Sequence, residues 1–204
     1  MMELYGGGVS RWVKCYWALK EIGQEFNEYS FNFSKGEHKS PQVLALNPFG
    51  KLPVLKDGDR IVFESSAILN YLGEKFPESE LVPKSGTPER TEYDQWTYFC
   101  VSVLESPLWQ ITQHTRLVPE HLRIPQLVEL AKAEFKQLAK TLDKWIESRS
   151  YLVGDRFSGA DIALVYDLNW AGGLGLLKDF VNLQDYRKEL SERPAFPKHL
   201  YARN

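Results

Sequence analysis

The chain lacks the features that mark several classes of protein. Only two of its 204 residues are cysteines, Cys15 and Cys100. A disulfide framework is therefore not expected, and a reducing compartment suits this usage. No apolar run approaches the roughly 18 residues that a membrane-spanning helix needs. The first residues, MMELYGGG, also lack the basic-then-apolar layout of a secretion signal. We therefore expect a cytoplasmic protein with no membrane partner.

An excess of charge of one sign is also missing. The 25 Lys and Arg residues nearly balance the 27 Asp and Glu residues, which leaves a formal net charge of −2. This balance gives no electrostatic reason to expect nucleic acid or an anionic membrane as a partner. Aromatic residues, in contrast, are plentiful at 13%. Some of them are candidates for the wall of an apolar pocket.

The first part of the chain predicts alternating strands and helices. The expected order is a strand at 2–5, a helix to about residue 22, a strand at 24–33, a short helix ending near residue 46, strands at 51–56 and 60–63, and a helix from residue 65. This is the thioredoxin arrangement. Thioredoxins carry C-x-x-C at the first helix, where this chain has Ser10-Arg11-Trp12-Val13. Disulfide exchange by that route is excluded, and Cys15 is expected to be a packed small hydrophobe.

The second part of the chain predicts helices only. The segment PESELVPKSGTPER at 77–90 has the composition of a linker. A long helical stretch follows, in which Pro107 is expected to cause a kink or break. Residues 120–149 predict an amphipathic helix whose apolar face includes Leu130. Ser158 and Asp161 have the spacing of a capping box at the start of a further helix.

The stretch 47–76, NPFGKLPVLKDGDRIVFESSAILNYLGEKF, is the most informative part of the sequence. Ser65 is a natural N-cap for the helix after the hairpin, and a helix start of this kind can hold a carboxylate. Pro53 cannot donate a hydrogen bond to a strand ladder. It fits either a cis Leu52–Pro53 bond or an ordinary trans edge proline, and the frequencies of the two isomers alone favour trans.

This run resembles the glutathione-binding core of the cytosolic glutathione S-transferases, with the phi-like and bacterial serine-type enzymes as the nearest pattern. The resemblance implies an α+β thioredoxin-like domain at 1–78, a linker at 79–87 and an all-α C-terminal domain at 88–204. It further implies a cis Pro53, glutathione as co-substrate, no metal, and a homodimer. Phe49 either inserts into the partner subunit or packs in its own core.

The resemblance also implies a set of binding residues. The glutathione-binding residues that it indicates are Arg11, His38, Lys39, Lys51, Leu52, Pro53, Glu64 and Ser65. Glu64 and Ser65 are expected to take the γ-glutamyl group, and the backbone of Leu52 to pair with the cysteinyl unit. His38 and Lys39 are expected to meet the glycine carboxylate, although without the resemblance an exposed His-Lys pair is usually solvated surface.

Ser10 is the candidate catalytic residue. A free thiol with a pKa near ~8.5 is mostly protonated at neutral pH, whereas the thiolate is the nucleophile. A hydroxyl that donates to sulfur at a helix N-terminus would favour the thiolate. The residue pattern alone also fits a simple N-cap at Ser10. Tyr5 offers a second hydroxyl, and Ser10 is preferred because it aligns without gaps with the family's Trp17-Ala18-Leu19 segment.

The expected reaction is conjugation of glutathione to a hydrophobic electrophile. Candidate walls of the electrophile pocket are Trp12, Trp96, Phe99 and Trp109, and the helical spacing of the last three also fits core packing. Peroxide reduction or isomerisation at the same site is an alternative, as is a binding or scaffold protein without catalysis. The sequence names neither the electrophile nor the pathway.

Overall fold

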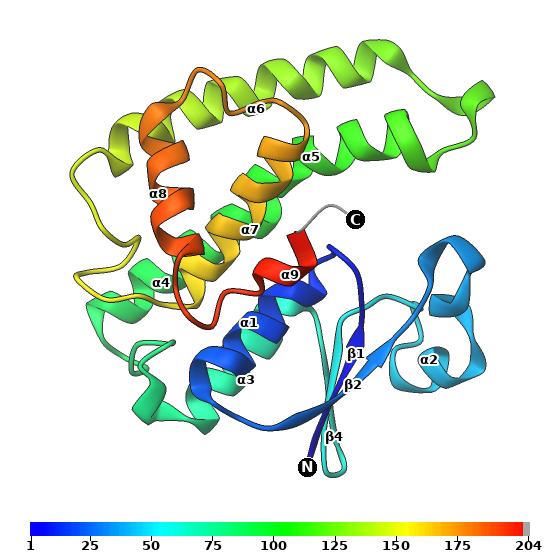
Figure 1. Ribbon diagram of the computed structural model, residues 1–204, viewed down its shortest axis with the longest axis vertical. Coiled ribbons are helices and arrows are strands. Elements are labelled where there is room, and N and C mark those ends of the chain that lie inside the picture. Colours follow the sequence, from blue (N-terminus) through cyan, green and yellow to red (C-terminus); the bar gives the residue numbers. More distant parts are fainter. Residues whose placement is uncertain (202–204) are drawn as a thin grey trace. The chain divides into compact units, whose positions relative to one another are not determined.

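The computed structural model describes residues 1–201 and divides the chain into two units (Figure 1). The first unit comprises Met1–Ser85 together with the tail that begins at Arg193, and the second comprises Gly86–Glu192. The expected succession of an α+β unit and a helical unit is confirmed. The tail differs from the expectation, because it groups with the first unit and not with the helices. The predicted C-terminal domain also covered residues 202–204, which lie outside the described residues.

The first unit is built on a four-stranded mixed sheet with the order β2-β1-β3-β4. Its strands are β1 (Met2–Gly6), β2 (Phe26–Ser30), β3 (Val54–Asp57) and β4 (Arg60–Phe63). β1 is parallel to β2 and antiparallel to β3, and β3 forms a hairpin with β4. The hairpin needs only two turn residues, because Gly58 adopts the positive φ of 60° that such a turn requires.

The first unit also contains helices, two of which lie between strands of the sheet in the chain. They are α1 (Trp12–Ile22), α2 (Pro41–Leu46), α3 (Ser65–Lys75) and α9 (Lys198–Tyr201). Short 3₁₀ turns occupy Phe33–Lys35, Glu37–Lys39 and Pro77–Ser79. α1 forms the crossover between the parallel strands β1 and β2, and almost its entire length is buried. Cys15 on this helix is fully buried, as expected of a packed hydrophobe.

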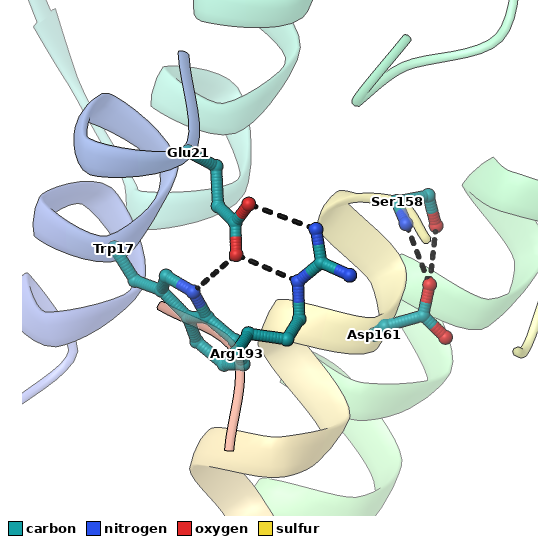
Figure 2. Close-up of polar contacts among 5 residues, drawn as sticks. All are labelled: Trp17, Glu21, Ser158, Asp161 and Arg193. Carbon is teal, nitrogen blue, oxygen red and sulfur yellow. Dashed lines mark hydrogen bonds and ion pairs between the residues drawn. The ribbon is translucent and has the colours of Figure 1, made fainter. Parts of the chain in front are cut away.

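A charge-paired contact holds the tail to the first unit (Figure 2). Arg193 donates from Nε and Nη2 to the carboxylate of Glu21 at 2.7 and 2.9 Å. The indole nitrogen of Trp17 donates to the same carboxylate at 2.8 Å. Phe196 then packs edge-on against Trp17, with ring centroids 5.0 Å apart. A bidentate guanidinium–carboxylate pair of this kind fixes orientation as well as distance, which explains why the tail belongs to this unit.

The second unit consists of helices. They are α4 (Pro88–Tyr98), α5 (Glu105–Thr112), α6 (Pro125–Ile146), α7 (Gly159–Gly173) and α8 (Val181–Ser191). π-helical segments at Phe99–Leu104 and Gln113–Leu117 follow α4 and α5, and a 3₁₀ turn lies at Glu120–Leu122. None of the helices within residues 1–201 is long and apolar enough to cross a membrane.

Two helix predictions need correction. Of the kink or break expected at Pro107, the break is absent, because the backbone stays helical from Phe99 through Thr112. Proline cannot donate to the carbonyl four residues before it, and the preceding segment is widened to a π-helix. Leu130 is 65% exposed, and the buried face of α6 is centred instead on Ala131, Phe135 and Leu142.

The predicted capping box at the start of α7 is present (Figure 2). The Oδ2 atom of Asp161 accepts from the backbone and the hydroxyl of Ser158, at 2.6 and 3.0 Å. Its Oδ1 atom accepts from the backbone of Leu152 at 2.7 Å and from the hydroxyl of Tyr186. Asp161 is completely buried, so these four donors compensate the loss of its hydration.

We predict that Asp161→Ala lowers the free energy of unfolding by about 2–4 kcal/mol, because it leaves buried donors without an acceptor. Chemical denaturation monitored by circular dichroism measures this change. Asp185→Ala, which removes an exposed aspartate of α8, is the matched control and should change stability by no more than about 0.5 kcal/mol. Equal losses in the two variants would contradict the buried network as a source of stability.

Candidate functional site

The strand register brings four connections to one end of the sheet. β1 and β2 are parallel and finish together, because Gly6 pairs with Ser30. The antiparallel β3 begins at this same end, where Val54 lies opposite Tyr5. β4 also finishes there, because Phe63 pairs with Val54. The turn after β1, the loop after β2, the entry to β3 and the start of α3 therefore share one edge of the unit.

Ser10 lies in the turn after β1. Its hydroxyl donates to the carbonyl of Gly7 at 2.9 Å and accepts from the backbone of Trp12 at 3.4 Å. Gly7 and Gly8 have φ angles of 135° and 61°, which residues with side chains rarely adopt. The glycines thus form a tight turn and place Ser10 immediately before α1. Arg11, which follows, occupies the N-cap position of that helix.

The entry to β3 contains a cis Leu52–Pro53 bond. The trans isomer favoured by general frequencies is therefore wrong, and the isomer implied by the family resemblance is present. Pro53 is buried and Leu52 is half-buried at the head of the strand. The backbone of Leu52 therefore lies at the end of the β1–β3 ladder, where an extended ligand can pair with it.

A buried asparagine, which the sequence analysis did not single out, shapes this entry. The side chain of Asn47 donates to the carbonyl of Lys51 at 2.9 Å and accepts from the backbone of Phe49 at 3.1 Å. Asn47 is 1% exposed. The exposed Nζ atom of Lys39 donates to the carbonyl of Phe49 at 2.9 Å, which is a further contact to this loop. The position of Asn47 in the NPFG segment was the available signal, since Asn stabilises turns through its side chain.

The start of α3 differs from the prediction. Ser65 is the first helical residue and not the N-cap, which is Glu64 with φ 70° and ψ 119°. This region costs a residue with a side chain about 1–3 kcal/mol, and such residues cluster at functional sites. Ser65 is 5% exposed, and its carbonyl accepts a long 3.9 Å contact from the thiol of Cys15. The neighbouring hydroxyl of Ser66 is buried and has no hydrogen-bond partner within residues 1–201.

The loop after β2 brings positive charge to the same end of the sheet. His38 stacks on Phe33, with ring centroids 5.2 Å apart. Burial, followed by the charges of Lys39 and Lys51, lowers the pKa of His38 below its usual value. The Nδ1 atom of His38 is buried without a partner within the described residues. Lys39 of this loop, Lys51 in the entry to β3 and the unsatisfied imidazole together make this end of the sheet suitable for an anion.

The side chain of Tyr5 already forms other contacts. Its hydroxyl donates to Glu3 Oε2 at 2.5 Å, and its ring stacks on Tyr29 with centroids 4.6 Å apart. Burial and the adjacent Glu3 carboxylate raise the pKa of Tyr5. A phenol with a raised pKa that already donates to a carboxylate is a poor donor for a ligand thiolate.

The aromatic residues predicted to line an electrophile pocket are packed against other rings. Trp12 is 2% exposed, and its ring lies 4.8 Å from that of Tyr16. In the helical unit Trp96 lies 5.5 Å from Phe99, and Trp109 lies 6.5 Å from Trp170. Their role as pocket walls stays a prediction. Within residues 1–201 no group of three or more His, Cys, Asp or Glu side chains is arranged to hold a metal ion.

The fold and this edge of the sheet define a class: a thioredoxin-like unit without a dithiol, followed in one chain by a helical unit. Residues 1–74 match the family model "Glutathione S-transferase, N-terminal domain", and residues 112–194 match "Glutathione S-transferase, C-terminal domain". The chain belongs to the glutathione S-transferase family.

Individual relatives are similar over nearly the whole chain. Glutathione S-transferase F9 of Arabidopsis thaliana is 30% identical, with 96% of this chain and 94% of that protein aligned. Glutathione S-transferase F10 of the same plant is 33% identical over 87% and 86%. Among solved structures, glutathione transferase URE2P6 from Phanerochaete chrysosporium, in complex with oxidized glutathione, has a TM-score of 0.87 and 29% identity over 98% of this chain and 94% of that one.

Because Asn47 holds the loop that precedes Leu52, we predict that Asn47→Ala both destabilises the protein and weakens glutathione binding. The substitution leaves the Lys51 carbonyl and the Phe49 amide unpaired, at a cost of about 1–3 kcal/mol. Thermal unfolding and calorimetric titration with glutathione measure the two effects. Gln42→Ala, at an exposed position of α2, should leave both unchanged, and an Asn47→Ala protein with unaltered affinity would show that this loop is not part of the site.

Proposed function

We propose that this protein conjugates the thiolate of reduced glutathione to hydrophobic electrophiles. The convergence of four connections at one end of the sheet is the observation that carries the proposal. It gathers a hydroxyl at a helix start, a cis-proline strand entry, a strained helix N-cap and a basic loop. Glutathione is a peptide with a thiol and two carboxylates, and each of these features suits one of its parts.

The γ-glutamyl end of glutathione is assigned to the start of α3. The free amides of a helix N-terminus and the hydroxyl of Ser65 suit its α-carboxylate. The carboxylate of Glu64 suits its α-amino group. Glu64 is held at a positive φ directly before the helix. Its side chain and the helix amides can therefore bind the α-amino group and the α-carboxylate at the same time. The backbone of Leu52, beside the cis Pro53, then pairs with the cysteinyl unit.

The glycine carboxylate is assigned to the basic loop formed by His38, Lys39 and Lys51. The charges of both lysines contribute to lowering the pKa of His38, which supports this assignment. A bound carboxylate would satisfy the unpaired Nδ1 atom once the imidazole is protonated. Arg11 adds positive charge at the N-cap of α1, near the same end of the sheet.

Ser10 is assigned to activation of the thiol. Lowering a thiol pKa by about two units requires roughly 2.7 kcal/mol of preferential stabilisation of the thiolate. One charge-assisted hydrogen bond from the hydroxyl, together with the field of the α1 N-terminus, is sufficient for this. The hydroxyl now donates to Gly7, and rotation about one bond would redirect it to sulfur.

We predict that Ser10→Ala lowers kcat/KM for conjugation of 1-chloro-2,4-dinitrobenzene by about 10²-fold or more, because the thiolate loses its donor. Tyr5→Phe removes the alternative hydroxyl and should leave the rate within about twofold. Glutathione binding by calorimetry should persist in both variants. Full activity in Ser10→Ala with loss in Tyr5→Phe would reverse the assignment, and failure of the wild type to bind glutathione at millimolar concentration would refute the proposal as a whole.

The lowered pKa of His38 leads to a pH prediction. An anion beside the imidazole favours its protonated form, so binding takes up a proton and affinity rises as the pH falls. With S-methylglutathione, which has no titrating thiol, the affinity should rise about two- to threefold between pH 7.5 and 5.5. His38→Gln should abolish this dependence. Calorimetry in two buffers of different ionisation enthalpy measures the proton uptake, and an unchanged pH slope in the variant would contradict the role of His38.

We also propose a homodimer that works in the cytosol. Phe49 is 67% exposed and lies 6.4 Å from the ring of Phe63, so it does not pack in its own core. An exposed aromatic pair of this kind suits insertion into a partner subunit. The contact is assigned to this loop together with α3 and α4, which follows the pattern of the family.

We predict a dimer for the wild type in sedimentation velocity at micromolar concentration. Phe49→Ser should weaken association by about tenfold or more, because an anchor residue is lost from the interface. Leu117→Ser, which changes another exposed apolar side chain, at 58% exposure, is the matched control. A monomeric wild type, or equal effects of the two substitutions, would refute this assembly.

A further inference from the structure

The loop between α6 and α7, yellow in Figure 1, has no role in the proposed reaction. It forms a cavity of about 330 Å³ within the helical unit. A space of this size accommodates a small organic molecule. The lining is polar and consists of Ser148, Arg149, Ser150, Tyr151, Gly154 and Asp155.

Arg149 supplies a positive charge to this cavity. Its guanidinium carbon lies 4.0 Å from the ring centroid of Trp145, four residues earlier. Trp145 in turn packs against Trp96, with centroids 4.3 Å apart. A guanidinium that lies over an aromatic face keeps its N–H donors at its own edge. Among residues 1–201 no carboxylate forms an ion pair with Arg149, so these donors can take a ligand carboxylate in a bidentate manner.

Asp155 supplies the opposite charge to the same cavity. It is exposed, and its carboxylate neither accepts a hydrogen bond nor forms an ion pair within the described part of the chain. Arg149 and Asp155 therefore line one cavity without pairing with each other. Two opposite charges in this arrangement favour a ligand that carries both, because each of its charged groups then has a partner.

The loop that carries these groups is anchored to the core of the helical unit. The backbone of Leu152 donates to Oδ1 of the buried Asp161 at 2.7 Å, and Leu152 and Val153 are themselves buried. Gly154 has a φ of 52°, which allows the chain to turn between the buried Val153 and the exposed Asp155. The cavity is therefore formed before any ligand arrives, which reduces the entropic cost of binding.

We propose that this cavity binds a free α-amino acid with a polar side chain, such as glutamine. The carboxylate binds Arg149 and the ammonium group binds Asp155, while the hydroxyls of Ser148 and Ser150 suit the polar side chain. An anion alone would be repelled by Asp155, and a cation alone by Arg149, so the zwitterion is the preferred ligand. The cavity shares no residue with the proposed glutathione site.

The test is a titration of the full chain with L-glutamine, followed by NMR through the indole N–H signal of Trp145, which contacts Arg149. The signal should shift as glutamine binds. Arg149→Gln should weaken binding about tenfold or more, because the carboxylate loses its bidentate partner. Asp155→Asn should weaken it at least several-fold, because the ammonium group loses its opposite charge.

Matched controls remove the same charges from neighbouring positions. Lys144→Gln and Glu147→Gln, both at exposed positions, should leave the affinity within about twofold. Two analogues test the ligand itself. Glutaramate lacks the ammonium group and 4-aminobutanamide lacks the carboxylate, so each should bind about tenfold more weakly than glutamine or worse.

Equal affinities of the Arg149→Gln and Lys144→Gln proteins would overturn the proposal, as would an analogue that binds as tightly as glutamine. The start of α3 is a competing place, because the γ-glutamyl end of glutathione is itself an α-amino acid. Loss of glutamine binding in Glu64→Gln, with retention in Arg149→Gln, would therefore also overturn this site. A protein that conjugates no glutathione is still expected to bind glutamine here.

Discussion

The pairing of β1 with β3 is the constraint on which the site depends. Val54 lies opposite Tyr5, so the strand that enters after the cis Pro53 begins where β1 ends. A slip of one residue would turn every side chain of β3 to the opposite face of the sheet. Leu55, which is fully buried, would then leave the core. Burial of the core thus fixes the register, and the register fixes which loops meet at the functional edge.

Local signals in the sequence were sufficient for most of the architecture. The closely spaced strands at 51–56 and 60–63 and the capping box of Ser158 and Asp161 each depend on residues within a short stretch of the chain, and both features were predicted. The shape of the start of α3 was not, because a serine after a strand is a good N-cap by composition. In the structure Glu64 takes the N-cap position with a positive φ, and the carbonyl of the following Ser65 contacts the thiol of Cys15 on α1.

Features that depend on distant partners were missed for the same reason. The hydrogen bonds of the Asn47 side chain form only when the backbone groups of Lys51 and Phe49 fold back onto it. Arg193 joins the first unit because Glu21, 172 residues earlier in the chain, accepts its two hydrogen bonds. Leu130 fits the periodicity of α6 but lies at the margin of its buried stripe, where a pattern of spacing alone cannot decide exposure.

The burial of the two cysteines has a consequence for a protein that handles reactive electrophiles. Cys15 and Cys100 are both fully buried, and burial raises the pKa of the Cys15 thiol, so it remains protonated. A protonated thiol that solvent cannot reach does not compete with glutathione for an alkylating agent. These two thiols are thereby protected from alkylation by the protein's own substrates, and only a molecule that has opened its core would be alkylated at cysteine.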